Sequence, residues 1–301
     1  MILLELQVTL QKNQDKPAVA AAPFLGGVLH GVLENLVRLH APAIGGDLGI
    51  TPRNGLKRYA VIPPPYGWQA PDNSSSIVMP CGIVLHGIAR QHATAVARLF
   101  DDWRTIRLNG RTDRVQRCRI RYHVPGIPAS SWQDPAIDIP YRSPDFSHAL
   151  HDADGITLNF FTPFKLGRPH KTMQDQRTPP GLLRIVRSLT RRIGKVEPDL
   201  AAALDIGSLS WVEAEERIRR QPIVSDRLIA VRWRYGSSTK QFPFPCHGFI
   251  GKITYTGPIP PRIAGLLHWG AWLGAGEGTA LGQGMYHAGR PLIELSTCEQ
   301  A

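Results

Sequence analysis

Hydrophobic and polar positions along this chain alternate between strand-like and helix-like periods in two successive series. In the first series, residues 2–10 alternate with a period of two, and Leu and Val recur at helical spacing over residues 24–39. The first series predicts strands over residues 2–10, 59–62, 77–85 and 117–123, and helices over residues 24–39 and 90–103. The second predicts strands over residues 155–161, 226–235, 248–256 and from Met285 onward, and helices over residues 180–196 and 262–273.

Each series has the element order β-α-β-β-α-β, which is typical of a ferredoxin-like domain. Residues 124–153 separate the two series and are rich in Pro, Ser and Asp, as interdomain connections often are. The sequence therefore predicts an α+β protein of two tandem ferredoxin-like domains, residues 1–150 and 151–301.

Charge narrows the class of partner. Among 301 residues, 35 are Lys or Arg and 24 are Asp or Glu, which gives a formal net charge of +11. Such a charge favours a polyanionic partner, because binding to phosphates releases counter-ions. A protein that is merely basic is the alternative at this point.

Cysteine usage and the N-terminus bear on location and metals. The four cysteines, Cys81, Cys118, Cys246 and Cys298, are far apart, and none has the spacing of a zinc site. They are typical of reduced thiols in a cytoplasmic protein. The chain begins MILLELQVTL, which is not a signal peptide, and no apolar run reaches the 18 residues of a membrane span. We expect no cofactor, no structural metal and no membrane contact.

A glycine-rich segment, GAGEGTALGQGMY, lies between the last predicted helix and the last predicted strand. Its glycines are Gly274, Gly276, Gly278, Gly282 and Gly284. Such density predicts sharp turns, and the exposed N–H groups of a turn bind phosphate. The segment is neither a Walker loop nor a dinucleotide fingerprint. A tight helix-to-strand connection is the alternative.

Several segments, in order, resemble the CRISPR-associated endoribonucleases of the RAMP superfamily that process precursor CRISPR RNA. ITLNFFTPFKLG resembles the family's L-x-F-x-T-P strand and turn, and RWRYGSSTKQ its W-x-R-Y-S-S-x-Q segment. GFIGKITYTG is similar to G-F-x-G-x-x-x-x-G, and the glycine-rich segment is similar to the signature loop. The likeness is dense over residues 155–288 and thinner before them, where IVLHGIAR resembles L-x-G-x-A.

The resemblance implies two ferredoxin-like domains and metal-independent cleavage within a CRISPR repeat. In that reaction the 2′-hydroxyl attacks the neighbouring phosphate and leaves a 2′,3′-cyclic phosphate and a 5′-hydroxyl. The implied partner is CRISPR repeat RNA, with other subunits of an effector complex as further candidates. The same fold also serves non-catalytic RAMP proteins that hold guide RNA, and this is the alternative function. A general RNA-binding module is disfavoured, since the sequence has no aromatic RNP-type motif.

The candidate catalytic residues lie on the first predicted helix. FLGGVLHGVLENLV resembles family helices with a histidine in a G-x-L-H context, and the match falls on His30. Glu34 and Arg38 follow at i+4 and i+8, so that the three form one polar stripe. Glu34 is placed to orient the imidazole and raise its pKa, and Arg38 to contact the phosphate. We expect Gly26 and Gly27 to leave open space above the ring.

His40, at the end of the same helix, is the competing candidate, and its alternative role is to interact with the helix dipole. The division between acid and base stays open, because the sequence assigns no tyrosine or serine partner.

RNA-binding candidates come from basic residues at helical or strand spacing. Those of the helix over residues 180–196 share one face beside a buried stripe, although a basic stripe is also typical of a solvated face. Arg117, Arg119 and Arg121 alternate on a strand. Lys165 and Arg168 follow a Thr-Pro turn that in the family lies near RNA. The set is Lys165, Arg168, Arg184, Arg187, Arg191, Lys195, Arg232 and Arg234, with Gly274, Gly276, Gly278, Gly282 and Gly284.

Overall fold

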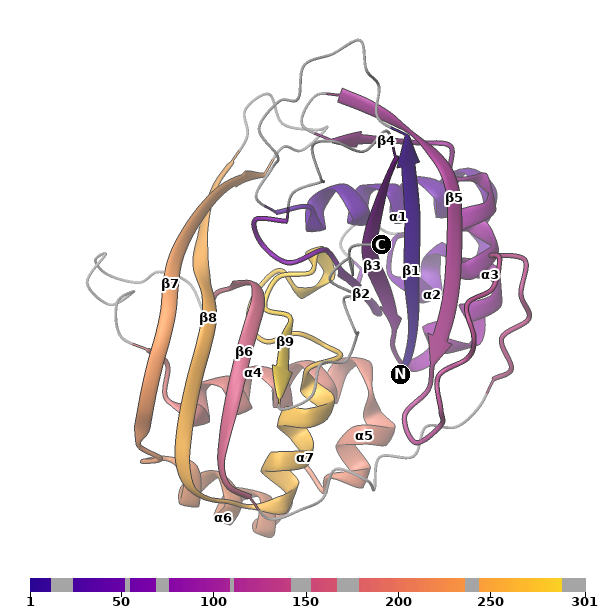
Figure 1. Ribbon diagram of the computed structural model, residues 1–301. Coiled ribbons are helices and arrows are strands. Elements are labelled where there is room, and N and C mark those ends of the chain that lie inside the picture. The colour runs from indigo at the N-terminus through magenta and orange to yellow at the C-terminus, as the bar shows by residue number, and fades with distance from the viewer. Residues whose placement is uncertain are drawn as a thin grey trace. The chain divides into compact units, whose positions relative to one another are not determined.

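The computed structural model describes residues 1–11, 24–51, 55–68, 76–108, 111–141, 153–166, 179–235 and 244–288. These residues form two compact units (Figure 1). The first contains the described residues up to 141 together with Ala280–Gly282. The second contains residues 153–279, where described, and 283–288.

The first unit contains an antiparallel sheet with the strand order β2-β3-β1-β5-β4. Its strands are β1 (Ile2–Gln11), β2 (Tyr59–Ile62), β3 (Ser76–Leu85), β4 (Thr105–Leu108) and β5 (Arg111–His123). Its helices are α1 (Gly26–His40), α2 (Gly45–Leu48) and α3 (Ala93–Leu99). Short 3-10 turns cover Pro42–Ile44, Gly87–His92, Phe100–Asp102 and Thr279–Leu281.

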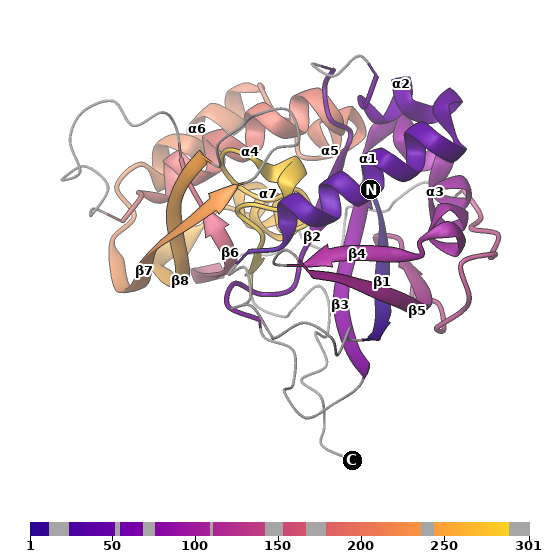
Figure 2. The same cartoon turned by 90° about the horizontal axis from the view of Figure 1, so that it is seen from above.

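Helices α1 and α3 pack on one face of this sheet, as Figure 2 shows. Leu29, Leu33 and Val37 recur at helical spacing on α1 and are buried in the same core as Leu4 and Leu6 of β1. Burial of each such side chain contributes about 1.5–3 kcal/mol. The core therefore fixes which face of α1 remains for polar side chains.

The second unit contains an antiparallel sheet with the strand order β7-β8-β6-β9. Its strands are β6 (Ala153–Phe164), β7 (Ile223–Tyr235), β8 (Phe244–Ile259) and β9 (Tyr286–Ala288). Its helices are α4 (Leu182–Val196), α5 (Pro198–Ala203), α6 (Leu209–Ile218) and α7 (Pro261–Gly270). Helices α4 and α7 lie on one side of the sheet (Figure 1).

The predicted fold class is confirmed. In both sheets the first and third strands of a β-α-β-β-α-β unit lie in the centre, with the second and fourth strands on either side, which is the ferredoxin-like order. Strand β4 is an additional strand at the edge of the first sheet. The helix predicted over residues 90–103 is divided into a 3-10 turn, α3 and a second 3-10 turn. Strand β4 and helices α5 and α6 were not predicted.

Three thiols are described, and Cys298 lies outside the described residues. Cys81, Cys118 and Cys246 are free. Burial raises the pKa of Cys118 to about 12, so that this thiol stays protonated. Within the described part of the chain, no helix is long and apolar enough to cross a membrane.

Candidate active site and RNA-binding residues

Helix α1 places His30 and Glu34 at the border between its buried and exposed faces. The apolar residues of α1 turn one face toward the core, and His30 and Glu34 lie one turn apart beside that face. Their side chains are only 13% and 15% exposed. The imidazole is therefore shielded from most water and still open to a substrate.

Tyr59, the first residue of β2, completes the surroundings of the imidazole. Its hydroxyl lies 3.0 Å from Nδ1 of His30 and 3.3 Å from Oε1 of Glu34, and it donates to one of them at a time. The two rings stack with centroids 5.6 Å apart. The carbonyl of Ala280, which belongs to this unit, also faces the imidazole and favours its protonated form by accepting a hydrogen bond from it. The orientation of the imidazole is thus fixed by two hydrogen-bonding neighbours and one ring contact.

Glu34 links this histidine to two cations. Lys57 Nζ donates to Oε1 of Glu34 at 2.7 Å, and Arg38 donates to Oε2 at 2.9 Å. The same Oε1 lies 3.4 Å from Nε2 of His30. The cluster of His30, Glu34, Arg38, Lys57 and Tyr59 therefore combines an imidazole, a phenol, a carboxylate and two cations, and we call it the His30 cluster.

Burial and charge set the protonation states in the His30 cluster. Burial lowers the pKa of His30, while the charge of Glu34 raises it. Lys57 and Arg38 then lower it, and the net direction is down. Burial opposes ionisation of Glu34, but the hydrogen bond and charge of Lys57 and the charges of His30 and Arg38 hold its pKa below the usual value. At neutral pH the site therefore holds a neutral imidazole beside an ionised carboxylate.

The space predicted above the ring at Gly26 is filled. A Cβ at Gly26 would collide with the carbonyl oxygen of Leu281 and would come within 2.5 Å of the Phe24 ring. The expectation of open space at this glycine was wrong, because the residue permits close packing of α1 against the 3-10 turn.

The structure separates the two candidate histidines. His40 is an exposed residue at the end of α1, where Nδ1 lies 3.7 Å from Oδ2 of Asp102. His30, Glu34 and Arg38 form the predicted polar stripe through contacts at i and i+4.

Sequence reasoning missed Lys57 and Tyr59. The available signal was a basic pair, Lys57 and Arg58, directly before a strand that begins with a tyrosine. A local pattern cannot show that β2 pairs with β3 next to α1, and this pairing delivers the two side chains to the imidazole.

The glycine-rich segment turns as sharply as predicted. Its five glycines have φ angles between 70° and 90°, a region that other residues rarely adopt. The N–H groups of Gly274, Gly276 and Gly284 donate to Gly270 O, Ser188 Oγ and Pro163 O at 3.0, 3.0 and 2.8 Å. These three amides are used inside the protein rather than exposed. A role of the five glycines in RNA binding stays a prediction.

The basic residues of α4 lie on the exposed face, as predicted. Leu182, Val186, Leu189 and Ile193 are buried on the other face. The exposed basic residues are Arg184, Arg187, Arg191 and Lys195.

Three of these four already have partners. Arg187 pairs with Glu215 at 3.2 Å, and Arg184 donates to the carbonyl of Leu166 at 3.2 Å. Arg191 reaches back to the carbonyl of Arg187 through Nε at 3.3 Å. RNA binding by this face stays a prediction.

A second basic group lies around the end of β6. Arg232 of β7 is opposite His247 of β8 in the sheet. Burial lowers the pKa of His247, and the nearby charges of Lys165 and Arg232 lower it further. Lys165 also lies 3.4 Å from Glu277 in the glycine-rich segment. Lys165 and Arg232 thus both lie near His247.

Two other RNA-binding candidates are not placed. Arg168 lies outside the described residues. For Arg234 only the backbone is described, and it pairs with Pro245. Arg121, from the alternating strand, pairs with the buried Glu5 at 2.5 Å, so its role is structural.

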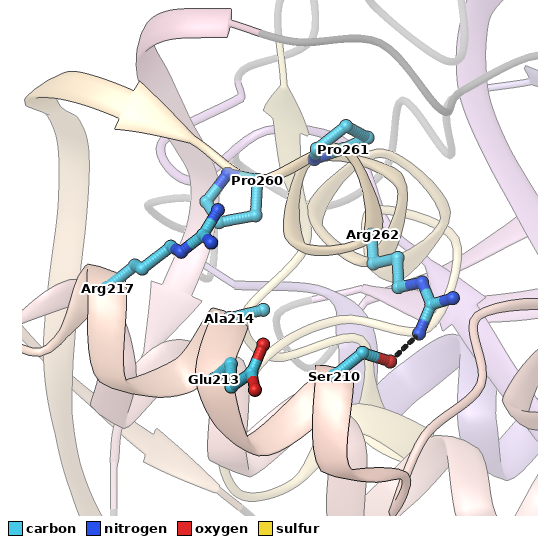
Figure 3. Close-up of a pocket in the computed structure, with 7 residues that line it drawn as sticks. All are labelled: Ser210, Glu213, Ala214, Arg217, Pro260, Pro261 and Arg262. Atoms are coloured by element: carbon cyan, nitrogen blue, oxygen red, sulfur yellow. Dashed lines mark hydrogen bonds between the residues drawn. The ribbon is translucent and has the colours of Figure 1, made fainter.

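A metal site and a second pocket are the other kinds of candidate site. Among the described residues, no group of three His, Cys, Asp or Glu side chains could hold a metal ion. A pocket of about 310 Å³ lies between α6 and the start of α7 (Figure 3). Its Arg262 is held by Asp205 at 2.6 Å and by Ser210. The pocket contains no member of the His30 cluster.

Part of the chain matches a known protein family. Residues 158–286 match the family described as CRISPR-associated endoribonuclease Cas6. No match is found among curated proteins.

Solved structures show the same fold over nearly the whole chain. A Cas6 product complex from Thermus thermophilus has a TM-score of 0.57 at 17% identity and covers 96% of this chain and 100% of its own. Another Cas6 product complex has a TM-score of 0.56 at 18% identity, with the same coverage. A Cas6-related protein from Pyrococcus furiosus has a TM-score of 0.52 at 12% identity and covers 95% of this chain and 98% of its own. The resemblance predicted from the sequence is confirmed: residues 158–286 match the Cas6 family, and the fold is shared with solved Cas6 structures.

Proposed function

We propose that this protein binds CRISPR repeat RNA and cleaves it without a metal ion, leaving a 2′,3′-cyclic phosphate and a 5′-hydroxyl. The observation that carries the proposal is the His30 cluster, in which an oriented imidazole lies beside two cations. The family match of residues 158–286 supports the substrate. The catalytic cluster lies in the domain of residues 1–150, and most RNA-binding candidates lie in the domain of residues 151–301.

His30 is the base in this proposal. A neutral imidazole accepts a proton, and the lowered pKa of His30 keeps it neutral near pH 7. When the Tyr59 hydroxyl donates to Glu34, Nδ1–H of His30 donates to the tyrosine oxygen, and Nε2 carries the lone pair. The imidazolium formed on taking the 2′-hydroxyl proton is then stabilised by Glu34 at 3.4 Å. Tyr59 is fully buried and acts as a positioning residue.

Lys57 and Arg38 supply positive charge to the phosphate. Both are ion-paired with Glu34 in the RNA-free protein, and Arg38 is 41% exposed. Charge that develops on the non-bridging oxygens is stabilised by cations already in place. Side chains alone thus provide a base and electrostatic stabilisation, which is the reason for proposing a metal-independent reaction.

The RNA contacts are proposed for the exposed face of α4 and for the group around Lys165. Arg191 and Lys195 carry exposed charges, and Lys165 and Arg232 both lie near His247. Arg184, Arg187, Arg168, Arg234 and the five glycines of the glycine-rich segment complete the proposed set. Other subunits of a CRISPR effector complex are proposed as further partners, in the cytoplasm.

The decisive test is single-turnover cleavage of repeat RNA, taken from the CRISPR array beside the gene, in the presence of EDTA. We expect a product with a 5′-hydroxyl and a cyclic phosphate. His30→Ala should slow cleavage by about 10²–10⁴-fold with little loss of RNA affinity. His40→Ala is the matched comparison on the same helix.

Three outcomes would contradict parts of the proposal. Loss of cleavage in EDTA with recovery in magnesium, or a 5′-phosphate product, would refute the metal-independent mechanism. Impairment of His40→Ala and not of His30→Ala would move the site along the helix. Tight binding without any cleavage by the wild-type protein would favour the guide-holding function.

A further inference from the structure

One face of the sheet in the second unit is left uncovered by the helices of that unit. Helices α4 and α7 pack on the other face, which Figures 1 and 2 both show. Leu158, Phe160 and Ile253 are buried on that helix-covered face. Side chains alternate along a strand, and residues opposite each other in antiparallel strands share a face. The neighbours Asn159 and Lys252 therefore lie on the helix-free face.

A row of polar residues crosses this face from edge to edge. The pairing register places Arg227 opposite Lys252, Lys252 opposite Asn159 and Asn159 opposite His287. Arg227 and Lys252 are exposed, and both charged residues of the row are cations. The row thus runs from two cations on β7 and β8 to an amide on β6 and an imidazole on β9.

An aromatic pair lies at the end of this row. Phe161 of β6 stacks on His287 with ring centroids 4.5 Å apart and an angle of 19° between the planes. Both side chains are half-buried, so the pair is not part of the core. Burial lowers the pKa of His287, and a neutral imidazole stacks without the cost of desolvating a charge.

Parallel aromatic rings beside cations on an open sheet suit a single-stranded nucleic acid. Every base has a flat face that stacks on an aromatic ring, and the phosphate between two bases pairs with Lys or Arg. Within the described part of the chain neither Arg227 nor Lys252 forms an ion pair, so both cations remain for phosphate, and the flat pair of rings beside them favours bases over a peptide. The net charge of +11 agrees with a polyanionic occupant.

We propose that this face is a stacking platform for bases of single-stranded RNA, with Phe161 and His287 as the stacking pair and Lys252 and Arg227 as phosphate contacts. The platform would take nucleotides of the substrate away from the scissile phosphate, so it extends the RNA-binding function proposed above. It is composed entirely of residues of the second unit, and it shares no residue with the His30 cluster.

The experiment is a fluorescence-anisotropy titration of the full-length protein with a labelled ten-nucleotide pyrimidine RNA that cannot form a hairpin. A second probe has the same backbone with abasic sites at its central positions. Phe161→Leu keeps an apolar side chain without a ring, and Phe161→Tyr keeps the ring as the matched control. We expect Phe161→Leu to weaken binding about 5- to 150-fold and Phe161→Tyr to bind like the wild type.

The abasic probe separates stacking from charge. The wild type should bind it about as weakly as Phe161→Leu binds the intact RNA, and Phe161→Leu should no longer distinguish the two probes. Lys252→Gln should reduce the slope of log affinity against log salt by about one. Equal binding of both probes by the wild type would refute the platform, and this comparison needs no variant that might unfold.

Two further outcomes would also refute it. One is an affinity of Phe161→Leu within twofold of the wild type at an unchanged melting temperature. The other is a change in oligomeric state with Phe161→Leu and no change in RNA affinity, which would make this face an interface between copies of the chain. The titration measures binding alone and does not depend on cleavage. A protein that binds the probes as expected but never cleaves repeat RNA would therefore refute the proposed function without contradicting the stacking platform.

Discussion

Replacing Glu34 by Gln should lower the pKa of His30 and move the pH profile of cleavage toward acid. The Glu34 carboxylate lies 3.4 Å from Nε2 of His30 and raises its pKa against burial and two cations. At this distance two unit charges interact by about 1.2 kcal/mol even at the dielectric constant of water. The pKa of His30 should therefore fall by about one in Glu34→Gln, and by more if Lys57 and Arg38 stay in place without their counter-ion.

The direction of the change follows from the role of a base. The rate rises with pH as a base loses its proton, so the wild-type profile should have an acidic limb below the usual pKa of a histidine. The pKa of Glu34 itself is held low, so this carboxylate does not titrate over the same range. In Glu34→Gln the limb should lie about one pH unit lower. The plateau should fall about tenfold, because the imidazolium formed in the reaction loses its partner.

The assay is the single-turnover rate between pH 5 and 9, with NMR titration of the imidazole of His30 as an independent readout. Glu216→Gln is the matched control, since Glu216 is exposed and pairs only with Arg219 at 2.6 Å among the contacts described. An acidic limb at the same or a higher pH in Glu34→Gln would refute the reasoning. A limb on the alkaline side that moves to lower pH would instead make His30 the acid.

Three further predictions concern stability and RNA affinity. Gly276→Ala should lower the free energy of unfolding by about 3 kcal/mol or more in thermal and denaturant melts, because φ is 90° and a Cβ would collide with the carbonyl of Lys165. Gly194→Ala, in an open part of α4, is the control and should raise the free energy of unfolding by up to about 1 kcal/mol. Arg191→Ala should reduce the slope of log RNA affinity against log salt by about one, and an unchanged slope would show that the residue does not contact phosphate. Arg121→Ala should lower the free energy of unfolding by about 3 kcal/mol, because it removes a cation that is ion-paired with the buried carboxylate of Glu5. A loss below about 0.5 kcal/mol in a urea melt would contradict this.

The order of the main elements was predictable because each has a clear period of its own. Helix α4 illustrates this, since its buried Leu and Ile residues recur every three or four positions. Strand β4 was missed because only Ile106 and Leu108 alternate in it, although the dipeptide Asn109-Gly110 that follows is typical of a hairpin. Helix α6 was missed for a related reason, since its buried face consists of only Trp211, Ala214 and Ile218.

Three of the five residues of the His30 cluster were predictable, and the division between found and missed residues has a physical reason. Glu34 and Arg38 lie on the same helix as His30, so helical geometry alone brings them together. Lys57 and Tyr59 reach the imidazole through the pairing of β2 with β3, a contact that no local pattern contains. Sequence reasoning therefore finds the partners within a helix and misses those that the sheet supplies.

Glycine was the residue type whose role the sequence predicted least well. The sharp turns of the glycine-rich segment were predicted, because a positive φ favours glycine regardless of the function of the turn. What occupies the space beside each glycine depends on distant segments. At Gly26 that space holds the carbonyl of Leu281, and at Gly276 it holds the carbonyl of Lys165. A sequence does not distinguish a glycine that leaves space for RNA from a glycine that leaves space for the protein's own backbone. At these two positions the backbone occupies the space. The close contact at Gly26 also places Ala280, the residue before Leu281, next to α1, where its carbonyl faces His30. Gly26 therefore contributes to the site by allowing this turn to pack beside His30, and not by leaving space for a substrate.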